Sequence, residues 1–152
     1  MSNEIEETQI LKGERFLPQV YDYYAGRAGG EFLRQLRDNA KIIGLRCPGC
    51  NRVYVPPRAT CIHCFKDLND FVEVSDEGTL VTYTVVNSQK EYYPAEAPFV
   101  YGIVKLDGAT TGLVHMLGEV NLQELTEGMR VKAVFKEERT ASILDIKYFR
   151  PL

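Results

Sequence analysis

The spacing of hydrophobic positions changes along the chain, and residues 1–40 have the spacing of helices. Between residues 31 and 39, apolar side chains fall on one helical face and polar ones on the other. The apolar residues are Phe32, Leu33 and Leu36. Glycines at 26, 29 and 30 separate this segment from an aromatic-rich stretch before it. We expect N-terminal helices here, and so short a helix must pack on the chain's own core or on a partner.

From residue 71 onward, apolar residues alternate with polar ones, which is typical of strands with one buried face. Such segments lie at 71–74, 79–87, 100–106, 110–117, 131–135 and 144–148. Asp107-Gly108 lies between two of them and is a strong hairpin signal. Asn121 followed by Glu124, with Gly128 as a stop, predicts a short helix that begins with a capping box.

The last five of these strands, with a helix between the third and the fourth, have the order of an OB-fold barrel. A small β-sandwich is the alternative, and the position of the helix favours the barrel. The expected architecture is mainly β. It comprises a helical leader over 1–40, a four-cysteine ribbon over 41–68 and a five-stranded OB-fold over 69–152.

The middle segment contains all four cysteines of the chain, in two close pairs. Cys47-Pro-Gly-Cys50 is followed after ten residues by Cys61-Ile-His-Cys64, which is the ligand spacing of a zinc ribbon. Two residues between cysteines let one tight turn bring both sulfurs to a single ion. Four protein ligands leave no position for water, so we expect a structural zinc ion and no metal catalysis.

Disulfides, a thioredoxin-type redox pair and an iron site are the alternatives for these cysteines. The first sixteen residues contain four glutamates and no apolar run, so no signal peptide is expected, and no segment is long and apolar enough to span a membrane. We therefore expect a cytoplasmic protein in a reducing compartment, where disulfides are rare. A redox pair would need a βαβ context that the pattern does not show. Iron in the same thiolates stays open.

The charge of the chain is unevenly distributed. The net charge is −3, yet residues 41–66 contain five basic residues and no acidic one. The five are Lys41, Arg46, Arg52, Arg58 and Lys66. These cations either offset the negative charge of a zinc–thiolate cluster or bind anions such as phosphates.

A long connection over 88–99 joins the first two expected barrel strands, where OB-folds commonly bind ligands. Its Lys90, Tyr92 and Tyr93 could hold an adenine and a phosphate of coenzyme A, or a partner surface, and an unremarkable long loop is equally open. His63 is expected in an exposed turn and His115 in a strand, satisfied by a neighbour. No catalytic residue is assigned, because no nucleophile, phosphate-loop or paired-carboxylate signature is present.

Several motifs resemble a family that joins a rubredoxin-like zinc ribbon to an OB-fold and is associated with acyl-CoA enzymes. They are GLRCPGC at 44–50, YVPPR at 54–58, CIHC at 61–64, GTLVTYTVV at 78–86, GMRV at 128–131 and FRP at 149–151. The resemblance covers about residues 40–152, and the helical leader also resembles the family. The chain departs from it after the second and fourth cysteines, where Asn51 and Phe65 replace a glycine and a small residue. Asn tolerates a left-handed backbone, so the first turn should survive.

The resemblance implies a non-catalytic accessory subunit of a thiolase-superfamily enzyme that helps to bind or transfer CoA thioesters. A thiolase needs a free thiolate, and here every cysteine is expected on zinc. A single-stranded nucleic-acid-binding module is the second hypothesis. Residues 67–152 carry 14 acidic against 8 basic residues, which argues against a nucleic-acid partner. A rubredoxin-like electron carrier is the third hypothesis.

Overall fold

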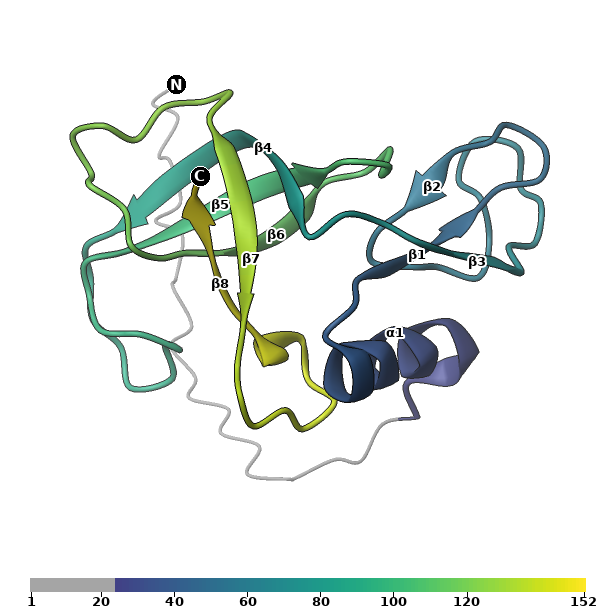
Figure 1. Cartoon of the computed structure of the whole chain (residues 1–152), viewed down its shortest axis with the longest axis horizontal. Helices are drawn as coiled ribbons and strands as arrows, with labels where there is room; N and C mark the ends of the chain where they lie inside the picture. The colour runs from purple at the N-terminus through teal and green to yellow at the C-terminus, as the bar shows by residue number, and fades with distance from the viewer. Residues whose placement is uncertain (1–23) are drawn as a thin grey trace, which may run out of the picture.

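The structure is a computed structural model of the whole chain, and it describes residues 24–152. Helix α1 (Gly26–Asn39) comes first and lies beside both the ribbon and the barrel (Figure 1). Its Phe32 and Leu36 are buried in the main core of the chain, so this helix packs on its own protein. The helix ends where Ala40 adopts a left-handed conformation and its amide donates to the Gln35 carbonyl.

The expected break in the helix at the glycines is wrong for Gly29 and Gly30, which lie inside α1. A glycine inside a helix costs only about 1 kcal/mol relative to alanine. Burial of two large side chains on the next turns outweighs that cost. The aromatic-rich stretch expected to precede this helix lies mostly outside the described residues.

The ribbon has a three-stranded antiparallel sheet in the order β2-β1-β3. It consists of β1 (Ile43–Arg46), β2 (Val53–Tyr54) and β3 (Asp70–Glu73). The strand expected at 71–74 therefore forms as β3, and it pairs with β1 on the ribbon side. The residue limits of the three expected parts stay a prediction.

The barrel is closed by five strands in the order β4-β5-β6-β8-β7. They are β4 (Glu77–Val86), β5 (Phe99–Leu106), β6 (Leu113–Leu117), β7 (Arg130–Phe135) and β8 (Ile146–Pro151). Only β6 and β8 pair in parallel, at Leu117 and Phe149, and the other pairs are antiparallel. This closed order confirms the OB-fold and rejects the sandwich.

The helix expected over residues 121–127 does not form, and a turn takes its place. Asn121 does begin the turn, because its side chain accepts from the Gln123 amide and its carbonyl accepts from the Glu124 amide. Gly128 then takes a positive φ of 87°, which ends the segment after too few residues to repay helix nucleation.

A complete capping box lies elsewhere, before β8, at the 3₁₀ helix η1 (Ile143–Asp145). Ser142 accepts from the Leu144 amide, and the carboxylate of Asp145 accepts from the amides of Thr140 and Ser142. Asp145 is 1% exposed, so its carboxylate fixes the β7–β8 connection from inside.

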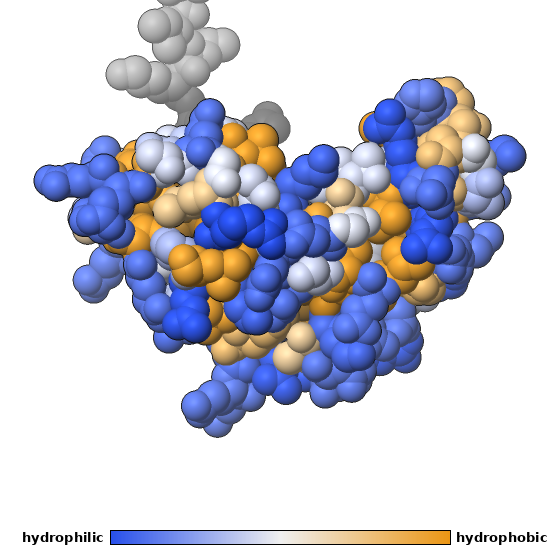
Figure 2. All heavy atoms as spheres, turned by 45° about the horizontal axis from the view of Figure 1, so that its top comes forward, coloured by the Kyte–Doolittle hydropathy of each residue, from blue (hydrophilic) through white to orange (hydrophobic). Residues whose placement is uncertain are grey.

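The ribbon and the barrel form separate lobes with a hollow between them (Figure 2). They are joined by hydrogen bonds to the β5–β6 loop, where Thr110 binds Val53 and Thr111 binds Val55 through backbone and hydroxyl groups. One hydrophobic core runs through α1, the ribbon strands and the barrel. Among residues 24–152, no helix is long and apolar enough to cross a bilayer.

Substitution of Gly78 by alanine should destabilise the barrel. A Cβ at this position would lie 2.4 Å from the Lys105 carbonyl oxygen, so β4 and β5 would have to separate. We expect the free energy of unfolding to fall by about 1–3 kcal/mol in urea titrations. Gly30→Ala is the matched control, because no atom lies within 4 Å of its Cβ position and alanine favours the helix. Equal stability of the two variants would contradict this account.

Candidate metal centre

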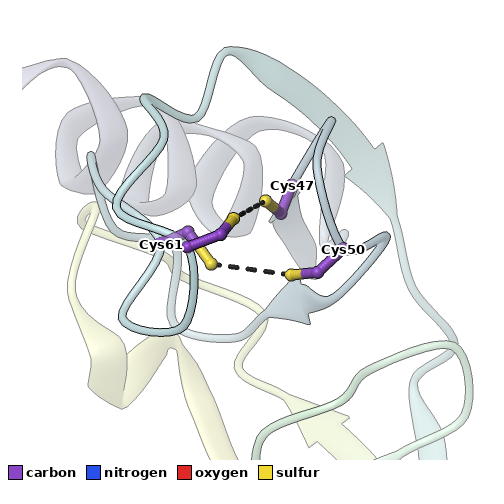
Figure 3. Close-up of side chains that lie close together, drawn as sticks. Cys47, Cys50 and Cys61 are labelled. Carbon is purple, nitrogen blue, oxygen red and sulfur yellow. Dashed lines mark hydrogen bonds between the residues drawn. The ribbon is translucent and has the colours of Figure 1, made fainter.

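The four cysteine sulfurs converge at one end of the ribbon, and all lie within 4.8 Å of one another. The Sγ atoms of Cys47 and Cys64 are 3.3 Å apart, and those of Cys50 and Cys61 are 3.6 Å apart (Figure 3). A zinc ion with Zn–S bonds of about 2.3 Å places its four sulfurs about 3.8 Å apart. The distances between the sulfurs are therefore close to those of a ZnS₄ tetrahedron.

The first pair of cysteines is held by a tight turn after β1. The Asn51 amide donates to the Cys47 carbonyl, and the Cys47 amide donates to the Arg52 carbonyl, at 2.9 and 2.8 Å. The Gly49 amide points at the Cys47 sulfur, 3.4 Å away. Asn51 has a φ of 57°, as its tolerance of the left-handed region predicts.

The second pair repeats this turn almost bond for bond. The Phe65 amide donates to the Cys61 carbonyl at 3.0 Å, and the Cys61 amide donates to the Lys66 carbonyl at 2.9 Å. The His63 amide lies 3.4 Å from the Cys61 sulfur, and Phe65 has a φ of 56°. Each turn thus directs an amide N–H at a sulfur, which stabilises the thiolate form that a metal needs.

The electrostatics of the cluster favour a cation at its centre. Burial raises the pKa of the Cys61 thiol, but hydrogen bonds from the Tyr54 hydroxyl and from the Cys64 and His63 amides outweigh it, and the pKa falls to about 5. The hydrogen bond with Cys47 raises the pKa of Cys64 to about 12. Four thiolates this close cannot all ionise unless a positive ion offsets their repulsion.

The sulfurs have apolar, buried surroundings on one side, whereas Cys50 and Cys64 on the other side are partly exposed. Cys47 and Cys61 are buried together with Leu45, Tyr54 and Leu68, which form a small second core. The hydroxyl of Tyr54 lies 3.1 Å from the Cys61 sulfur and is buried with it. Residues 41–68 thus contain a donor set that fits a structural zinc ion.

The structure divides the five expected ribbon cations into two groups. Lys41 pairs with Glu73 at 2.7 Å, and Arg46 pairs with Asp70 at 3.7 Å, both from β3. Arg58 lies over the Tyr54 ring, 5.2 Å from its centroid. Arg52, Arg58 and Lys66 make no ion pair within residues 24–152.

The other candidate residues, Lys90, Tyr92 and Tyr93, lie in the β4–β5 loop at the opposite end of the molecule from the ribbon (Figure 1). Tyr93 packs edge-on against Phe99 with ring centroids 5.6 Å apart, whereas Tyr92 is 77% exposed. The structure therefore does not bring the loop residues and the ribbon cations into one site.

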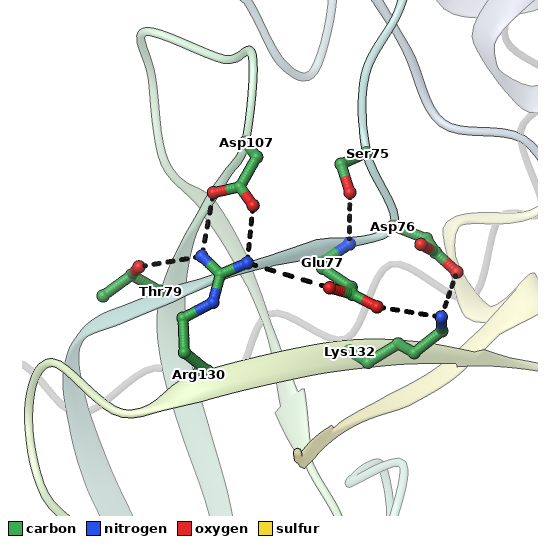
Figure 4. A network of polar contacts seen from close by, with 7 residues as sticks. All are labelled: Ser75, Asp76, Glu77, Thr79, Asp107, Arg130 and Lys132. Carbon is green, nitrogen blue, oxygen red and sulfur yellow. Dashed lines mark hydrogen bonds and ion pairs between the residues drawn. The ribbon is translucent and has the colours of Figure 1, made fainter.

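The barrel cations near the ribbon are already engaged by carboxylates (Figure 4). Arg130 binds Asp107 through both terminal nitrogens, and this hydrogen bonding lowers the pKa of the Asp107 carboxyl. Lys132 bridges Glu77 and Asp76 at 3.0 and 3.6 Å. This network ties β7 to β4 and to the β5–β6 loop, and carboxylates compensate both Arg130 and Lys132.

The two histidines are placed differently. His63 lies in the exposed second cysteine turn, as expected. His115 is 4% exposed in β6, and its Nε2 lies 3.2 Å from the Ile143 carbonyl oxygen. Its Nδ1 has no hydrogen-bond partner among residues 24–152, and burial lowers the pKa of the imidazole. The Ile143 carbonyl therefore satisfies one of the two ring nitrogens, and the expectation that a neighbour satisfies His115 holds only for Nε2.

Two models of one protein family match adjacent parts of the chain. A model of the ChsH2 rubredoxin-like zinc ribbon domain matches residues 34–70, and one of the ChsH2 C-terminal OB-fold domain matches residues 71–136. The chain is a DUF35-type protein, a zinc ribbon joined to an OB-fold. The ribbon model and the converging cysteines together support a structural zinc ion in this DUF35 protein.

Relatives agree with this assignment. The chain is 27% identical over 124 residues to a DUF35 domain-containing scaffold protein of Methanocaldococcus jannaschii, covering 78% of this chain and 87% of the relative. A protein of Pyrococcus furiosus with the same description is 26% identical over 109 residues, covering 71% and 78%.

Solved structures show the same architecture. A structure described as an Ltp2-ChsH2(DUF35) aldolase is 26% identical, with a TM-score of 0.63, over 83% of this chain and 95% of that one. A DUF35 protein of unknown function from Sulfolobus solfataricus is also 26% identical, with a TM-score of 0.62, over 83% and 84%.

Cys61→Ser should abolish metal binding. Loss of one ligand leaves three thiolates and an incomplete tetrahedron, so zinc measured by mass spectrometry should fall from about one ion per chain to near zero, and the ribbon should unfold. Tyr54→Phe is the matched control, because it removes only the hydroxyl at the Cys61 sulfur. It should keep zinc and lose about 1–2 kcal/mol of stability. A folded, metal-free wild-type protein would contradict the assignment.

Proposed function

We propose that this chain is a non-catalytic accessory subunit of a thiolase-superfamily enzyme complex, where it assists the binding or transfer of a CoA thioester. The observation that carries the proposal is the convergence of all four cysteines of the chain on one cluster. A thiolase-type reaction needs a thiolate free to attack an acyl group, and cysteines that ligate zinc are not free. The nucleophile would then come from another polypeptide.

The described relatives support an assembling role. The two archaeal proteins are described as scaffold proteins, and one solved structure is described as an aldolase of Ltp2 with ChsH2. From these descriptions we infer that this chain also has a partner enzyme. The family resemblance indicates that this partner is a thiolase-superfamily enzyme acting on acyl-CoA. Nothing in the comparisons favours a nucleic-acid module or an electron carrier.

The contribution to CoA handling is best sought in the β4–β5 loop. Lys90 and Tyr92 are exposed there, so an ammonium and an aromatic face are both available to a phosphate and an adenine. Of the ribbon candidates, Lys41 and Arg46 are compensated by carboxylates of β3. Arg52, Arg58 and Lys66 remain as candidates at the other end of the molecule.

Co-expression with a thiolase-superfamily enzyme of the same organism should yield one complex. We expect the two chains to co-elute in size-exclusion chromatography with light scattering, and thioester turnover to require both. The chain alone should turn over no acyl-CoA. An enzyme that is fully active alone and never co-elutes, or turnover by this chain unaided, would refute the proposal.

A double substitution, Lys90→Glu with Tyr92→Ala, tests the loop as a CoA contact. We expect the KM of the complex for acyl-CoA to rise about tenfold, because a charge contact and a stacking surface are lost together. The kcat and the elution of the complex should not change. Lys105→Glu is the control for net charge, since Lys105 is an exposed residue of β5 outside the loop. An unchanged KM would remove this loop from CoA binding.

A further inference from the structure

The tip of the second cysteine turn exposes two large apolar side chains. Phe65 is 80% exposed and Ile62 is 63% exposed, in a segment whose other apolar residues largely enter the ribbon core. Among the large hydrophobic residues of 24–152, only Tyr24 is more exposed than Phe65. These two side chains contribute little to the folding of the ribbon.

Phe65 is an unusual residue for its position in the second turn. Asn51 occupies the same position in the first turn, with a φ of 57° against 56° for Phe65, and both amides make the same hydrogen bond. An L-residue other than Gly, Asn or Asp is disfavoured in this left-handed region. Ala40, Glu119 and Ala141 also adopt a positive φ, but Phe65 combines this backbone with an aromatic ring left in water, which the turn itself does not require.

Basic residues predominate on the ribbon segment that contains this apolar tip. Residues 41–66 contain no acidic residue, although Asp67 follows at once, and Arg52 and Lys66 directly follow the two left-handed positions. The side chain of Lys66 extends over the first turn, since a Cβ on Gly49 would lie 2.9 Å from its Cδ. With Arg58, these cations have no acidic partner within the described part of the chain. The ribbon projects as its own lobe, so its surface is open to a partner (Figure 2).

We propose that Ile62 and Phe65, bordered by Arg52, Arg58 and Lys66, form the surface through which this chain docks on its partner enzyme. We name these five residues the knuckle surface. The matching site on the enzyme is an apolar pocket that receives the phenylalanine ring, with acidic residues at its rim. The inference rests on the proposed function, and it adds which surface makes the contact and what chemistry it requires.

Charge and size argue for a protein partner over a lipid surface. Two apolar side chains give weak membrane anchoring, and stable attachment needs a second strong signal. Three basic residues also fall short of the roughly four to eight that mark sites for anionic lipids. Aromatic residues and arginine are enriched at protein interfaces, and a few such side chains commonly contribute most of the binding energy. A second copy of this chain is the remaining occupant, and the test separates it.

Phe65→Asn is the decisive variant, because it repeats the residue of the first turn. The left-handed position then suits its residue, so the zinc content should stay the same and the melting temperature should not fall. Affinity for the co-purified partner enzyme, measured by calorimetry, should weaken about 10- to 30-fold. Val114→Asn is the matched control, since Val114 is 62% exposed on the barrel, and it should bind normally. Raising NaCl from about 0.1 to 0.5 M should weaken wild-type binding.

Each other result overturns the inference in a distinguishable way. If wild-type protein forms the complex and Phe65→Asn binds equally well, the contact lies elsewhere and the proposed function stands. If wild-type protein forms no complex, the proposed function fails first. If Phe65→Asn instead abolishes self-association, or binding to phosphatidylserine vesicles, with the enzyme contact unchanged, the knuckle surface belongs to a second copy or to a bilayer.

Discussion

The repulsion among four thiolates in one small volume is the constraint on which the ribbon depends. The sulfurs lie within 4.8 Å of one another, and a dication at their centre turns that repulsion into a cross-link between two turns. The ribbon sheet has strands of only four, two and four residues, and its second core is a handful of side chains. The metal therefore supplements the small hydrophobic core of this segment, and β3 leads from the cross-linked ribbon into β4.

Local chemistry made the metal centre and the barrel order predictable from the sequence. Doubled CxxC spacing allows few geometries, so the cysteine cluster follows from the spacing alone. Asp107-Gly108 marks the β5–β6 hairpin because glycine takes a φ of 89° there. Period-two alternation located the barrel strands to within a few residues, since each strand buries one face.

The errors arose where a local signal lacked tertiary support. Asn121 begins only a turn, because Leu125 alone packs into the core and Gly128 ends the segment soon after, whereas the capping box at Ser142 succeeds because buried Asp145 closes it. Ion pairing could not be predicted from the sequence either. Lys41 and Arg46 have their carboxylate partners on β3, at Glu73 and Asp70, and only strand pairing brings these residues together. The candidate residues of the β4–β5 loop and the ribbon cations likewise lie at opposite ends of the molecule, which the sequence does not reveal.

A protein whose thiols all bind metal has no free thiolate for catalysis, but it can still position a partner or a ligand. The ribbon is suited to that task. Metal ligation would hold its two turns together, and hydrogen bonds to Thr110 and Thr111 attach the ribbon to the barrel. The two cysteine turns make matching backbone hydrogen bonds and both expose their left-handed residue, but the second turn exposes an aromatic ring where the first exposes an amide. Ala40, Glu119 and Ala141 also adopt left-handed conformations in this chain, so backbone strain alone does not set Phe65 apart. What does is an aromatic ring that is 80% exposed at such a position, and the proposed docking contact accounts for that exposure.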